Sequence, residues 1–231
     1  MAKKIRIVYT APLSACFVLA CTAVLILSRF TGDALISAFF SAPARQGSLS
    51  AFNAVSPLHY LRLFIHIFGH KDALSFGANA ALILLLGPRL EERYGDSILS
   101  LMMGAAAFVS GICSAAFSPS VLYGSDGIVF LMIVLYAFAY AKKEGILFTN
   151  ILLFVLYVFG KIFPLFGISA ASISASASPL GNNAALIAAL AHLAGGLCGS
   201  LFAFAASPAS SRRTRTKQIL PETAEAAKSA K

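Results

Sequence analysis

Long apolar runs separated by short polar segments dominate the pattern along this 231-residue chain. About 20 consecutive, mostly apolar residues are enough for a helix to cross a bilayer. Six such stretches cover residues 11–28, 74–86, 98–117, 127–141, 146–160 and 184–206. The pattern therefore predicts an all-α polytopic membrane protein with six transmembrane helices. Because the second and fifth stretches are short, we expect them to be tilted or to end in water lined by protein.

The segments between and beyond these stretches differ in character. Residues 31–72, which we place outside the cell, are too rich in aromatic side chains for a free loop, so we expect short helices half in the outer leaflet. The Ser/Ala-rich segment 168–183 is expected to be mobile. Residues 1–10 form the predicted N-terminus, residues 11–206 the membrane domain, and residues 207–231 a basic, disordered tail.

Composition supports the membrane interpretation. The chain is 58% hydrophobic and only 12% charged, and its mean hydropathy is +0.82. Soluble domains average about 45–50% apolar and about 25% charged residues, so a soluble globular protein is excluded. The four cysteines lie inside apolar runs, with no spacing typical of a disulfide framework or a zinc site.

The net charge of +9 reflects orientation rather than nucleic-acid binding. If the N-terminus is cytoplasmic, 13 of the 18 Lys and Arg residues fall on the inner side of the six predicted spans. This asymmetry follows the positive-inside rule. It predicts two cytoplasmic termini in a bacterial plasma membrane, with contacts between the basic tail and anionic lipids.

Ionisable side chains at membrane depth are costly and therefore indicate a candidate site. Asp126 is the only charged residue between residues 97 and 141, and His192 is the only side chain of the sixth stretch that titrates near neutral pH. His66 and His70 lie on the approach to the second stretch, and Asn79 follows nine positions after His70. By the predicted topology, these residues converge a few residues below the outer surface.

Three strings carry a more specific pattern. Residues 61–95 read LRLFIHIFGHKDALSFGANAALILLLGPRLEERYG, with Arg62, His66, His70, Asn79, Gly87, Glu91 and Gly95. Residues 123–133 read YGSDGIVFLMI, and residues 191–200 read AHLAGGLCGS, in which Gly195 and Gly199 follow His192. In this order, the strings resemble the second helix, the nucleophile motif and the last core helix of rhomboid intramembrane serine proteases.

The resemblance implies a six-helix rhomboid-like bundle with a Ser–His dyad that opens outward through a water-filled cavity. The family serine attacks a peptide bond of a client transmembrane segment. His192 takes the position of the general base and Asn79 an oxyanion position. Arg62 is expected to tie the external segment together. Gly195 and Gly199 are expected to let the fourth and sixth helices approach.

Two positions depart from the family pattern. The motif G-x-S-G becomes Gly124-Ser125-Asp126-Gly127, which puts Asp126 at the nucleophile position and moves the hydroxyl by about 100° around the helix. Ser75 stands where the family has an oxyanion histidine. Both departures favour a proteolytically inactive member that recognises client transmembrane segments. The alternative is an active protease that uses Ser125 with His192 as general base.

Further interpretations concern single residues. Asp126 could cap the fourth helix, and we expect it to hydrogen-bond His192. His66 and His70 have the spacing of a metal pair but no evident third ligand, so a structural role is expected, with no metal and no cofactor. An intramembrane aspartyl protease would need two carboxylates that share one site. Asp126 is alone in the predicted spans, so this class of protease is excluded. Glu91 is expected to belong to a solvated cytoplasmic cap, and Tyr157 to carry no chemistry.

Overall fold

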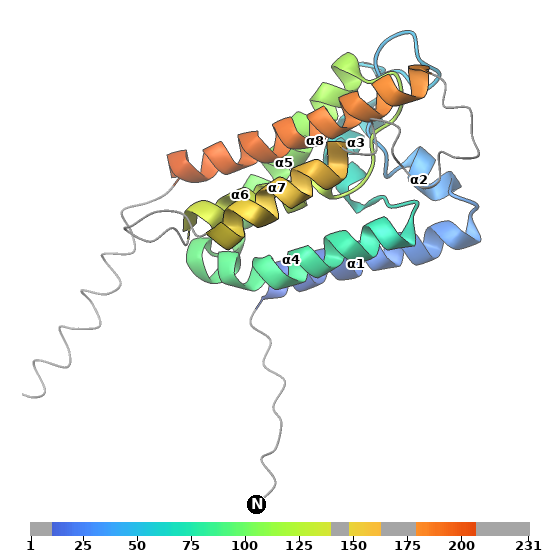
Figure 1. Ribbon diagram of the computed structural model, residues 1–231. Coiled ribbons are helices and arrows are strands. Elements are labelled where there is room, and N and C mark those ends of the chain that lie inside the picture. The colour runs from blue at the N-terminus through green and yellow to red at the C-terminus, as the bar shows by residue number, and fades with distance from the viewer. Residues whose placement is uncertain (1–10, 140–147, 163–178, 207–231) are drawn as a thin grey trace, which may run out of the picture.

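The computed structural model describes residues 11–139, 148–162 and 179–206 (Figure 1). The predicted N-terminus, the basic tail and most of the Ser/Ala-rich segment lie outside the described residues. The described helices are α1 (Pro12–Phe30), α2 (Ala34–Ala38), α3 (Pro57–Ile65), the 3-10 helix η1 (His66–Phe68), α4 (Ala73–Tyr94), α5 (Asp96–Phe117), α6 (Asp126–Ala139), α7 (Phe148–Ile162) and α8 (Pro179–Ala206).

The predicted all-α membrane bundle is confirmed. Helices α1, α4, α5 and the 183–202 part of α8 are long and apolar enough to cross a membrane. The apolar helices α6 and α7 are shorter and border residues outside the description. Figure 1 shows the long helices running alongside one another.

One predicted boundary is wrong. The second stretch was expected to end near residue 86 as a short span, but α4 is 22 residues long and continues through Pro88 to Tyr94. The extra turns are held by packing against α1: a Cβ on Gly87 would overlap the Ser14 side chain, so the two helices lie close together at this point. Tertiary packing here outweighs the helix-breaking tendency of proline.

Helix α6 is the centre of the bundle. It is apolar on every side, and 11 of its 14 residues are buried. It packs against α4, α5, α7 and α8. A helix without a polar face is stable only when it is surrounded, so the first residues of α6 are presented to four neighbouring helices.

Residues 31–72 contain short helices, as predicted, and Arg62 connects two of them, α2 and α3. The buried Arg62 guanidinium donates to the carbonyl oxygens of Ser41 and Ser37, at 2.7 and 3.2 Å, and to the Ser41 hydroxyl at 2.7 Å. Ala42 forms an isolated antiparallel bridge with Leu122, just before α6. The segment thereby fixes the chain that leads into the central helix.

Glu91 is buried, and its expected place in a solvated cap is wrong. Only 4% of the residue is exposed. Its carboxylate accepts hydrogen bonds from the backbone N–H groups of Leu13, at 3.1 Å, and Ser14, at 2.7 Å. The first N–H groups of a helix have no partner within the helix and favour an anion. Glu91 thus anchors the start of α1 to α4.

We expect Glu91→Ala to lower the free energy of unfolding by about 1–3 kcal/mol, because it leaves buried backbone donors without an acceptor. Glu92→Ala is the matched control. Glu92 is the exposed neighbour on the same helix, so its loss should change stability by less than about 0.5 kcal/mol. Unfolding of both variants in detergent micelles checks this, and equal losses would contradict the anchoring role.

Candidate functional site

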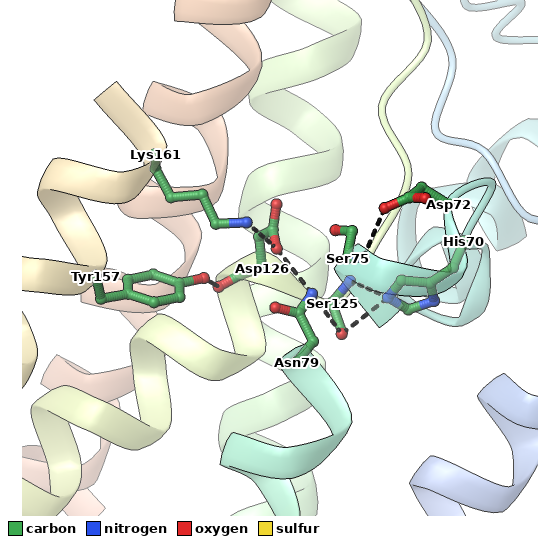
Figure 2. Close-up of polar contacts among 8 residues, drawn as sticks. All are labelled: His70, Asp72, Ser75, Asn79, Ser125, Asp126, Tyr157 and Lys161. Carbon is green, nitrogen blue, oxygen red and sulfur yellow. Dashed lines mark hydrogen bonds and ion pairs between the residues drawn. The ribbon is translucent and has the colours of Figure 1, made fainter. Parts of the chain in front are cut away.

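The loop before α6 places Ser125 against the start of α4. Gly124 has a φ of 104°, a region that favours glycine, and its N–H donates to the carbonyl of His66. Ser125 Oγ lies 3.1 Å from His70 Nε2 and accepts a hydrogen bond from Asn79 Nδ2 at 3.3 Å. The Ser125 N–H also points to His70 Nε2, at 3.2 Å. Figure 2 shows this cluster.

His70 is held as a neutral acceptor. Burial lowers its pKa below the ordinary histidine value, so it is uncharged near pH 7. Because Nε2 faces the Ser125 N–H, the ring proton belongs on Nδ1, which lies 3.3 Å from the carbonyl oxygen of Phe68. The nearest imidazole to the Ser125 hydroxyl is therefore on the segment before α4.

Asp126 begins α6, and its contacts cross to α4 and α7. Its Oδ1 accepts from Asn79 Nδ2 at 2.7 Å and from Lys161 Nζ at 2.6 Å. Tyr157 OH donates to the Asp126 carbonyl oxygen at 2.8 Å. Figure 2 shows Lys161 and Tyr157 reaching Asp126 together from α7. Asp126 is thus the ionic link between α6 and α7 rather than a cap of its own helix.

Lys161 and Tyr157 were missed as site residues. From the sequence, Lys161 is placed among the cations of the outer side and Tyr157 carries no chemistry, and their contacts with Asp126 are not predicted. A signal was available, because Asp126 is the only charge between residues 97 and 141 and Lys161 directly follows the fifth stretch. Two opposite charges at the same membrane depth are expected to pair.

His192 lies nearby but is not bonded to either candidate nucleophile. It is 7% exposed, and its Nδ1 has no hydrogen-bond partner among the described residues. Its ring centroid is 6.4 Å from that of His66. The expected hydrogen bond between Asp126 and His192 is not found among the described residues, where Asn79 and Lys161 both bind Asp126 Oδ1.

The Ser75 hydroxyl makes no hydrogen bond with the cluster among the described residues, although Figure 2 shows Ser75 next to it. Ser75 is exposed in the first turn of α4, where its backbone N–H donates to Asp72 Oδ2 at 2.6 Å. His66 is fully buried, with Nδ1 3.0 Å from the carbonyl oxygen of Leu63 and Nε2 3.4 Å from Ser110 Oγ. The described residues contain no group of three potential metal ligands.

Glycines bring α6 and α8 together, among them the expected Gly127 and the additional Gly196. A Cβ on Gly127 would lie 3.2 Å from the His192 carbonyl oxygen, and one on Gly196 would lie 2.7 Å from the Gly127 carbonyl oxygen. Added Cβ atoms on Gly195 and Gly199 would meet Ala106 and Met102 of α5, and the one on Gly199 would also lie 3.1 Å from Leu131 Cδ1 of α6. The helical period turns Gly195 and Gly199 mainly toward α5.

A cavity of about 540 Å³ opens between α6, α7 and α8. Asp126, Tyr157, Lys161 and His192 line it. Ser125, only 1% exposed, is not among the lining residues. The cavity therefore presents an ion pair and an imidazole, while the serine hydroxyl faces α4.

The comparison with protein families identifies this architecture. The model of the rhomboid domain matches residues 57–209, about two thirds of the chain. The match contains every residue of the Ser125–Asp126 cluster. A comparison with curated proteins found no match.

Replacement of Gly196 by alanine tests the close approach of α6 and α8. The added methyl would meet the Gly127 carbonyl oxygen and Phe130 Cδ1, both at 2.7 Å, so we expect a loss of about 1–3 kcal/mol in unfolding free energy. Gly104→Ala is the control, because nothing lies within 4 Å of its Cβ position. A neutral or stabilising effect of Gly196→Ala in micelles would contradict the described packing.

Proposed function

Because the chain belongs to the rhomboid family, we propose that it is a proteolytically inactive member that binds transmembrane segments of client proteins. The chain is an integral, multi-pass membrane protein of a family that acts on membrane proteins within the bilayer. The proposal includes the orientation with both termini in the cytoplasm, supported by the distribution of Lys and Arg.

The proposal rests above all on the contacts of the Asp126 carboxylate. The family motif assigns this position to the nucleophile, and here it holds a carboxylate bound to Lys161 at 2.6 Å and Asn79 at 2.7 Å. Proteases that use aspartate share a proton between two carboxylates. Asp126 is the only carboxylate among the described residues that line the cavity.

The environment of Ser125 also disfavours proteolysis. A nucleophilic serine needs an adjacent base and access to the substrate, but the Ser125 hydroxyl is buried against His70 and outside the cavity. Asn79 donates to both Ser125 and Asp126, so its amide is not free to stabilise an oxyanion. The competing proposal, an active protease with Ser125 and His192, requires the start of α6 to rotate.

A fluorophosphonate probe, which reacts with activated serines, separates the two proposals. We expect the purified wild-type protein to remain unlabelled and to leave a helix-destabilised model transmembrane substrate uncut. Labelling that disappears in Ser125→Ala would establish an active serine and overturn the inactive proposal.

The same assay also tests whether a variant can gain proteolytic activity. Asp126→Ser supplies a hydroxyl at the family position, and Lys161→Met removes the cation that would otherwise remain unpaired. We expect the double variant to gain labelling and cleavage, with the rate limited by the missing oxyanion donor at Ser75, typically about 10²–10³-fold. Adding His192→Ala should silence it.

A further inference from the structure

The cavity beside the site is lined by a charge-neutral pair that remains partly accessible. The side chains of Asp126 and Lys161 are 22% and 29% exposed, and both line the cavity of about 540 Å³. This volume is within the usual range of ligand sites, roughly 300–1,000 Å³. A partly exposed pair can bind a further polar group without being broken.

The pair has unused hydrogen-bonding capacity. Both contacts to the Asp126 carboxylate use Oδ1, and Oδ2 accepts no hydrogen bond from the described residues. The Lys161 ammonium carries three donors, of which the described residues take one, at Asp126 Oδ1. One acceptor and two donors therefore stand next to each other at the cavity.

We propose that the Asp126–Lys161 pair selects client transmembrane helices that carry an Asn or Gln side chain. This inference rests on the proposed function. The carboxamide N–H donates to Asp126 Oδ2, and the carboxamide oxygen accepts from Lys161 Nζ. A carboxamide carries its donor and its acceptor on two separate atoms, which matches the separate acceptor and donor atoms of the pair. A Lys or Glu side chain would place a third charge in a poorly hydrated site, which is costly.

The other walls of the cavity suit a helix as the occupant. Ala184 and Ala188 of α8, four residues apart, and Gly160 of α7 line it. Small residues at this spacing allow two membrane helices to approach closely. His192 is the one polar residue that α8 contributes to the described lining, so the wall opposite α7 is otherwise apolar.

Binding of synthetic helices to the full-length protein in phosphatidylcholine vesicles tests the selection. The probes are dye-labelled Leu/Ala transmembrane peptides with one Asn placed in turn at four consecutive positions near the outer end. Matched peptides carry Leu, Lys or Glu there. Energy transfer from the labelled protein gives the affinity. We expect the best-placed Asn peptide to bind roughly 3- to 30-fold more tightly than the Leu peptide.

Variants of the protein test whether the Asp126–Lys161 pair is responsible for the preference for Asn. Asp126→Leu with Lys161→Met should bind Asn and Leu peptides equally, and apolar replacement of a whole buried pair is usually tolerated by the fold. Lys71→Met, which removes a lysine that does not line the cavity, should keep the preference for Asn.

Failure of the proposed selection and failure of the proposed function give different results in this experiment. Equal wild-type binding of Asn and Leu peptides, or a preference for Lys or Glu, would overturn the selection and leave the proposed function standing. No binding of any peptide would overturn the proposed function and the selection with it.

Discussion

A single carboxylate at the start of a largely buried helix determines the arrangement of this site. Asp126 begins α6, a helix with no polar face at the centre of the bundle. A charge there must be paired and hydrogen-bonded. Lys161 and Asn79 both bind Asp126 Oδ1, so α4, α6 and α7 meet at one oxygen atom. Tyr157 adds a hydrogen bond from α7 to the Asp126 backbone.

The glycine contacts and the ion pair hold α6 on different sides. Toward α8 the contact is steric, because Gly127 and Gly196 let the two backbones approach. Toward α7 it is polar, supplemented by the rings of Phe154 and Tyr157 against Phe130. The space left between α7 and α8 is the cavity. Asp126 lines this cavity and is at the same time held by its neighbours on α4 and α7.

The sequence was sufficient for the bundle, the family resemblance and most of the site's members, since lone polar residues in apolar runs are conspicuous. The sequence did not predict which partner a polar side chain binds. Asp126 pairs with Lys161 rather than His192, and Glu91 turns inward to α1. The spacing of Gly195 and Gly199 also did not reveal that both pack mainly against α5, because helical spacing alone does not identify the neighbour.

Asp126 and Lys161 act as one unit at the start of α6. A double-mutant cycle on unfolding free energy in micelles, with Asp126→Asn and Lys161→Met, measures this directly. The claim predicts that each single variant is destabilised, and that the double variant recovers stability with a coupling of about 1–3 kcal/mol. Additive losses, with no coupling, would contradict it.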